Sequence, residues 1–144
     1  MNRVQRLFFR APIGLYRIGF GGLLGGRFLL LEHTGRKSGL QRRTVLEVLE
    51  SGDDGPVIAS GFGEGSQWCR NVMATPDVWI TRGRTRTQAK ADRLGHDDAV
   101  EVFERYRRDH ARAAKVLGKR IGVSLVDDLE TAAERLPLFR LRPA

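Results

Sequence analysis

Apolar residues recur along this 144-residue chain in short runs that predict five or six strands. Some runs alternate apolar with polar residues, as in half-buried strands, and others are continuously apolar, as in strands buried on both faces. Gly, Asp and Ser form the expected turn between two of these runs, at 51–55. The predicted strands cover 28–32, 43–50, 56–60, 78–81, 84–91 and 138–141.

Helical spacing of apolar residues predicts three helices within the same region. A short one covers 67–74, with Ser66 as its N-cap and Pro76 just beyond its end. A long one covers 97–117, and a shorter one lies near 125–135. Little chain remains for helical crossovers between strands, so the strands should pair antiparallel. The pattern therefore predicts an α+β fold, a small barrel of about six mostly antiparallel strands with peripheral helices.

The segment before residue 27 has a different pattern. A helical wheel places four arginines on one narrow arc and apolar residues on another: Arg3, Arg6, Arg10 and Arg17 against Val4, Leu7, Phe8, Ala11, Leu15 and Ile18. Arg17, Arg27 and Pro12 argue against a membrane span over 11–31. An amphipathic helix here lies either on an anionic membrane surface, through residues 1–20, or over the core of the domain. We predict a helix and Gly-rich loop over 1–26, followed by the barrel domain over 27–144.

The charge balance indicates a polyanionic partner. The formal net charge is +8, the pI is about 10.7, and most of the cations are Arg, whose guanidinium suits phosphate and carboxylate groups. Nucleic acid, an anionic membrane surface and a charged cofactor all fit this pattern. A single cysteine, Cys69, excludes an internal disulfide and the usual cysteine zinc sites, and it fits a reducing cytoplasm. The oligomeric state stays open.

The most distinctive motif is the basic turn, defined here as residues 34–43, between two apolar runs. It holds Arg36, Lys37, Arg42 and Arg43, with the Ser38 hydroxyl as a neutral donor. Two glycines allow successive N–H groups to converge on one point, and charge-assisted hydrogen bonds to an anion are strong. The turn is therefore either an anion site or a solvated hairpin whose cations keep the sheet edge soluble.

Three further residues are candidates for ligand contact. Ser60 ends an apolar strand and opens into the glycine-rich loop 61–65, and it either holds a ligand or caps a turn. Trp68 and Asn71 share a face of the short helix. The indole either packs on a flat conjugated ring or anchors the core, and the amide either pairs with a heterocycle or adds local polarity.

Candidates for proton transfer lie on the long helix. Tyr106 and His110 are four residues apart and share a face, so either is able to deliver a proton to a reducing substrate, although surface exposure is the alternative for both. No metal site is expected, because the histidines His33, His96 and His110 have no metal-binding spacing.

These motifs together resemble the deazaflavin-dependent nitroreductase family, whose actinobacterial members use coenzyme F420. The resemblance rests on the basic turn, on Ala59-Ser60 with the glycine loop, on the run 67–76 that holds Trp68 and Asn71, and on the closing segment 136–143. It implies a split β-barrel and a deazaflavin that carries a phosphate and a polyglutamate tail.

The resemblance also implies roles for individual residues. The anionic part of the coenzyme is matched by Arg36, Lys37, Ser38 and Arg42, and the deazaflavin end by Ser60, Gly61, Trp68 and Asn71. Tyr106 falls near a region where family members place tyrosines over the substrate. The chain departs from the common pattern at Val45 (often Pro), Glu47 (often aromatic), Gly61 (often Lys) and Cys69 (often aromatic). The N-terminal helix is similar to segments linked with membrane-borne substrates, which favours a quinone.

We therefore expect a reductase that passes a hydride from C5 of reduced coenzyme F420 to an electron-poor acceptor: a quinone, an activated enone or a nitro compound. Tyr106 is the first candidate proton donor and Ser60 the second. Flavin mononucleotide (FMN) is the alternative cofactor. The alternatives without catalysis are a membrane-binding protein and a nucleic-acid-binding protein that uses 84–90 as a β-ribbon. Neither needs the helix with Trp68 and Asn71, and we expect no nucleic acid partner.

Overall fold

The computed structural model describes residues 27–60 and 63–144. The predicted N-terminal helix, the predicted boundary at residue 26 and Gly61 lie outside these residues. The strands are β1 (Phe28–Thr34), β2 (Gln41–Glu50), β3 (Val57–Ala59), β4 (Asp77–Arg82), β5 (Thr85–Arg93) and β6 (Leu138–Pro143). The helices are η2 (Gly63–Gly65), α2 (Gln67–Ala74), α3 (His96–Asp109), α4 (Ala111–Ile121) and α5 (Leu129–Arg135).

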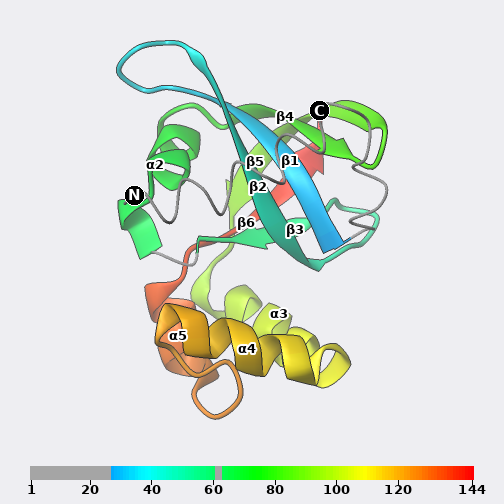
Figure 1. Ribbon diagram of the computed structural model, residues 1–144, viewed down its shortest axis with the longest axis vertical. Coiled ribbons are helices and arrows are strands. Elements are labelled where there is room, and N and C mark those ends of the chain that lie inside the picture. Colours follow the sequence, from blue (N-terminus) through cyan, green and yellow to red (C-terminus); the bar gives the residue numbers. More distant parts are fainter. Residues whose placement is uncertain (1–26, 61–62) are drawn as a thin grey trace.

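Within the described residues, six strands close into a barrel in the order β1-β2-β3-β6-β5-β4, and every neighbouring pair is antiparallel. Closure removes the exposed strand edges that an open sheet would present. The predicted α+β barrel with peripheral helices is therefore confirmed (Figure 1).

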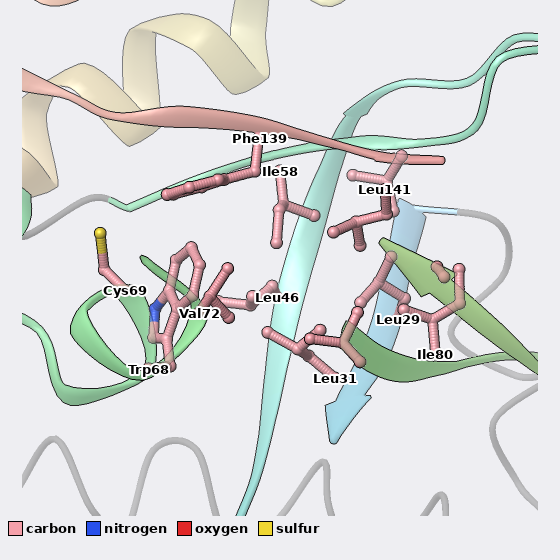
Figure 2. Close-up of a cluster of buried hydrophobic side chains, with 13 residues drawn as sticks. Leu29, Leu31, Leu46, Ile58, Trp68, Cys69, Val72, Ile80, Phe139 and Leu141 are labelled. Atoms are coloured by element: carbon pink, nitrogen blue, oxygen red, sulfur yellow. The ribbon is translucent and has the colours of Figure 1, made fainter. Parts of the chain in front are cut away.

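The interior of the barrel is filled from alternate positions of its strands. Leu29 and Leu31 of β1 are fully buried there, and Leu46 of β2 joins them. Helix α2 contributes Trp68, Cys69 and Val72 to the same cluster (Figure 2). These side chains give α2 one apolar face that is buried against the barrel, as expected for a short amphipathic helix.

Helices α3, α4 and α5 form a second layer on a different part of the barrel from α2 (Figure 1). Ala99, Val102, Phe103 and Tyr106 recur at helical spacing on α3 and pack with Leu49 and Val57 of the barrel. The prediction of one helix over 97–117 is wrong, because the chain breaks at His110 between α3 and α4. Neither Gly nor Pro lies at the break, and the helical spacing of apolar residues continues across it. The sequence therefore predicted one helix where the structure has two.

The hairpin of β1 and β2 extends beyond the barrel and carries the basic turn to a place beside α2 (Figure 1). The backbone closes the turn, with Gly35 N–H donating to Leu40 O and Gly39 N–H donating to Gly35 O, both at 2.8 Å. Gly39 has φ of 73°, in the left-handed region that glycine adopts most readily. The turn is thus a folded element that presents its side chains in one place.

The basic strand β5 is partly neutralised by its neighbours on the barrel. Arg86 forms two hydrogen bonds with the Glu32 carboxylate, at 2.8 and 3.1 Å, and its guanidinium lies 3.9 Å from the centroid of the Trp79 ring. Arg142 of β6 pairs with Asp92 of β5 at 2.9 Å. Arg86 therefore packs on the barrel wall, through Glu32 and Trp79.

Candidate functional site

The basic turn and α2 are joined by Arg36. Its guanidinium Nη1 donates to Gln67 Oε1 at 2.9 Å and to Asn71 Oδ1 at 2.8 Å, and its backbone N–H donates to the same Asn71 oxygen at 3.1 Å. These bonds cross more than thirty residues of sequence. They bring two residues of the predicted site, Arg36 and Asn71, into direct contact.

Asn71 is 4% exposed and its amide is engaged on both sides. Its nitrogen Nδ2 lies 3.1 Å from Nδ1 of His33, which is also 4% exposed. Since the amide oxygen already accepts from Arg36, the amide nitrogen is the donor and His33 Nδ1 is the acceptor. Asn71 therefore links the end of β1 to the basic turn.

The remaining side chains of the turn are open to solvent. Lys37, Ser38 and Arg42 are exposed, and Arg42 Nε lies 3.7 Å from the position that a Cβ on Gly35 would occupy. Among the described residues, no carboxylate lies within ion-pair distance of Arg36, Lys37 or Arg42. Three cations without an acidic partner, gathered around one turn, fit a multiply charged anion such as a phosphate with a carboxylate tail.

Ser60 is fully buried beside the start of α2. Its hydroxyl donates to the Gly63 carbonyl and lies 2.9 Å from the Ser66 hydroxyl, while its backbone N–H donates to Pro137 O at 2.9 Å. Ser66 is the residue before α2, as predicted, but its side chain makes no capping bond. The Ser60 hydroxyl is thus already satisfied within the protein, which is unfavourable for its predicted contacts with coenzyme and substrate.

Trp68 lies in the barrel core with 9% of its surface exposed. Its ring meets Phe139 edge-on, with centroids 5.8 Å apart (Figure 2). The neighbouring Cys69 thiol is buried, and burial raises its pKa, so it is a poor nucleophile. The indole of Trp68 therefore anchors α2 in the barrel core.

Tyr106 lies in another place, on α3. Its hydroxyl donates to Glu47 Oε2 at 2.9 Å, and the other Glu47 oxygen accepts from Arg27 at 3.0 Å. The ring of His110 packs against Tyr106 with centroids 5.6 Å apart. A cavity of about 210 Å³ opens beside this group, lined by Arg27, Val48, Leu49, Glu50, Ser51, Tyr106 and His110.

The chemistry of Tyr106 is set by its burial. Burial and the Glu47 carboxylate raise the pKa of the phenol well above its ordinary value. The hydroxyl proton is also held by the Glu47 carboxylate. Both features are unfavourable for the predicted role of Tyr106 as a direct proton donor, whereas His110 is exposed at the same cavity.

The structure thus divides the predicted residues between two places. Arg42, in the basic turn, and Glu47, beside Tyr106, are both on β2 and five residues apart. At about 3.4 Å per residue, roughly 17 Å of strand separates them. Arg36, Lys37, Ser38, Arg42 and Asn71 gather at one end of β2, and Tyr106 lies near the other. A ligand that contacts both places must extend along this strand.

Several residues contact the predicted site residues but were not predicted from the sequence to belong to the site. They are His33, Gln67, Arg27 and Glu47. A signal for His33 was present, because it follows Leu29 and Leu31 on the inward face of β1 and so had to be buried with a partner. The contact between Glu47 and Tyr106 spans 59 residues and had no local signal. Glu47 had been noted only as a departure from the family pattern.

No helix in 27–60 and 63–144 is long and apolar enough to cross a membrane. In the same residues, no three side chains among His, Cys, Asp and Glu form a group that could hold a metal ion.

The sequence is similar to one protein family and to a protein from Mycobacterium tuberculosis. A family model described as F420H(2)-dependent quinone reductase matches residues 8–125, which is most of the chain. The Mycobacterium tuberculosis protein Rv3178, named for F420H(2)-dependent quinone reductase activity, is 34% identical over 79 residues. That match covers 54% of this chain and 66% of the relative, just under two thirds of its length.

Solved structures share the fold at low identity. F420-H2 dependent reductase FDR-A has a TM-score of 0.55 and 20% identity, with 81% of this chain and 94% of that chain covered. HutZ, the heme storage protein from Vibrio cholerae, has a TM-score of 0.59 and 15% identity, with 84% of each chain covered. At these identities the likeness shows the barrel fold alone, and the family match carries the assignment.

Proposed function

The chain belongs to the F420H(2)-dependent quinone reductase family, a family of oxidoreductases, and from this premise we propose that it transfers a hydride from reduced coenzyme F420 to a quinone. The predicted resemblance to F420-dependent split-barrel reductases is confirmed at the level of family. Activated enones and nitro compounds are the other predicted acceptors, and the assay compares them with a quinone.

The observation that carries the proposal is the site formed by the basic turn and α2. Lys37 and Arg42 are exposed and have no acidic partner within residues 27–60 and 63–144, and Arg36 is held in place by Asn71. A phosphate with a chain of carboxylates is the anion that such a site binds best, because each added charge-assisted hydrogen bond lowers the free energy of binding. Ser38 adds a hydroxyl donor beside the cations. We assign the anionic part of coenzyme F420 to this site.

The cavity beside Tyr106 is our candidate site for the acceptor. Its volume of about 210 Å³ is of the order that holds one substituted aromatic ring, since a cavity of about 150 Å³ binds benzene. The aromatic rings of Tyr106 and His110 line it, and the Arg27 guanidinium is a donor for a carbonyl oxygen. This combination suits the ring and polar oxygens of a quinone.

Reduction of the quinone takes one proton besides the hydride, and oxidation of the reduced coenzyme releases one proton, so the reaction as a whole balances. Bound reduced F420 supplies the hydride, and a quinone that receives it must also gain one proton to become a neutral hydroquinone. We assign delivery of that proton to His110, because an imidazole is able to act as a general acid and this ring is open at the cavity. Tyr106 then serves as the wall that positions both His110 and the acceptor.

The competing functions are less well supported by the arrangement of the cations. The strand proposed as a nucleic-acid ribbon, β5, has Arg86 paired with Glu32 and Asp92 paired with Arg142. A nucleic-acid surface would present such arginines to phosphates. Binding of an anionic membrane surface through residues 1–20 stays a prediction, and FMN stays the alternative cofactor.

The experiment is an anaerobic assay with purified full-length protein and reduced F420. Oxidation of the coenzyme is followed by absorbance after addition of a short-chain naphthoquinone, a cyclic enone or a nitroaromatic compound. We expect the quinone to have the highest kcat/KM of the three. If the enone or the nitro compound is preferred, the assignment of the acceptor fails. If no compound is reduced faster than by free coenzyme, the proposed enzyme activity fails.

A further inference from the structure

His33 is a buried polar side chain at the end of β1 without a role in the proposed reaction. It follows Leu29 and Leu31 on the inward face of the strand and is 4% exposed. A polar ring that is taken out of water costs free energy unless it is hydrogen-bonded. The partner that His33 finds is the side chain of Asn71, 3.1 Å away.

The hydrogen bonds run in one direction from the basic turn to His33. The Arg36 backbone N–H and its Nη1 both donate to Asn71 Oδ1, and Asn71 Nδ2 donates to His33 Nδ1. If the amide were rotated by half a turn, its nitrogen would face the two Arg36 donors and its oxygen would face His33. The acceptor on His33 therefore selects the orientation in which Asn71 holds Arg36.

The charges around His33 keep its ring an acceptor. Burial and the positive charge of Arg42 lower the pKa of His33 to about 4, so the ring is neutral at ordinary pH. The neutral ring then carries its proton on Nε2 and leaves Nδ1 free to accept.

We propose that His33 is a positioning residue for the anion site, which orients the Asn71 carboxamide so that Asn71 fixes the backbone and guanidinium of Arg36. His33 does not touch the anion; it acts through Asn71. The inference rests on the proposed function, because the anion is taken to be the phosphate and carboxylate part of coenzyme F420. Without His33, Asn71 is free to rotate, and Arg36 loses a fixed direction toward the anion.

The test compares two variants of His33 in the full chain. In His33→Leu the ring is replaced by an apolar group of similar width, so the acceptor is lost. In His33→Asn an acceptor oxygen is retained close to the position of Nδ1. Two-dimensional ¹H–¹⁵N NMR, recorded without coenzyme, monitors the Arg36 backbone amide and the Asn71 side-chain amide. Titration with coenzyme F420 measures the affinity, and thermal unfolding by circular dichroism checks that each variant is folded.

We expect the Arg36 and Asn71 amide signals to shift or broaden in His33→Leu and to stay near their native positions in His33→Asn. We expect the F420 dissociation constant to rise at least fivefold in His33→Leu and less than twofold in His33→Asn. Native signals in His33→Leu, or equal losses in the two variants, would overturn the proposal. If His33→Leu does not fold, His33→Asn decides, because an unchanged dissociation constant supports the role and a fivefold rise refutes it.

The two measurements separate this inference from the proposed function. If the native protein does not bind F420, the proposed function fails. The amide signals in the two variants then decide whether His33 orients Asn71 and Arg36, independently of any coenzyme.

Discussion

The carboxamide oxygen of Asn71 accepts two hydrogen bonds from Arg36, one from the backbone N–H at 3.1 Å and one from Nη1 at 2.8 Å. A single buried side chain on α2 thus fixes both the path of the basic turn and the direction of one of its cations. The turn is exposed, but its conformation is tied to the barrel core through α2.

Substitution of Asn71 by Leu is expected to reduce the free energy of unfolding by about 1–3 kcal/mol. The change leaves His33 Nδ1 and the Arg36 N–H without partners, and an unpaired buried polar group costs about that much. Urea denaturation measures the loss. The matched control is Gln67→Leu, which removes one exposed bond to Arg36 and is expected to cost less than about 0.5 kcal/mol. Equal losses for the two variants would contradict the role of Asn71.

The double substitution Arg36→Ala with Lys37→Ala is expected to weaken F420 binding by at least about tenfold, or 1.4 kcal/mol. Both residues supply cations to the proposed anion site, and removing charge-assisted hydrogen bonds has an effect of this size. Isothermal titration calorimetry provides the measurement. Arg112→Ala with Lys115→Ala, on α4, makes the same change in net charge away from the site. If both double variants lose the same affinity, the effect comes from net charge, and the site is wrongly placed.

Stability should depend on pH through His33. Its pKa is lowered from 6.5 to about 4 in the folded protein, so between these values the unfolded chain binds a proton that the folded protein does not. The free energy of unfolding should therefore fall as the pH is lowered through this window, by on the order of 3 kcal/mol in total. Above pH 6.5 the ring is neutral in both states and contributes no pH dependence.

The check is urea denaturation of the native protein and of His33→Asn between pH 4 and 7. The variant is expected to lose less stability than the native protein over this window, since it lacks the titrating ring. Parallel stability curves would show that other groups cause the acid sensitivity, and that the pKa of His33 is not lowered.

His110→Gln is expected to lower kcat for quinone reduction by roughly 100-fold, the lower end of what a positioned acid or base contributes. Tyr106→Phe should change KM more than kcat, because the phenol positions the acceptor and its proton is held by Glu47. A loss of kcat in Tyr106→Phe that exceeds the loss in His110→Gln would restore Tyr106 as the proton donor.

The extent to which the sequence predicted this structure depended on whether a feature had a local signal. The strands and α2 follow from apolar periods and turn residues within a few positions, so the barrel could be predicted. The bounds of α2 match the predicted 67–74. The break at His110 could not be predicted, since neither Gly nor Pro marks it in the sequence.

In the candidate site, too, only the features with a local signal could be predicted from the sequence. The cations of the basic turn were visible as a motif, and the structure presents them together. The bonds that orient them, from Asn71 to His33 and to Arg36, join residues 35 or more positions apart and needed the fold. For Ser60 and Trp68 the sequence left a ligand contact and a structural role open, and the structure shows the Ser60 hydroxyl bonded to Gly63 and Ser66 and Trp68 packed in the core.

The most direct test of the central claim is a titration of the purified full-length protein with coenzyme F420 and, separately, with FMN. Tryptophan fluorescence and cofactor absorbance report binding, and the Arg36→Ala, Lys37→Ala variant is measured beside the native protein. We predict saturable binding of F420 at low micromolar concentration, weaker binding of FMN, and loss of F420 affinity in the variant. Tighter binding of FMN, or no saturable binding of F420, would contradict the account.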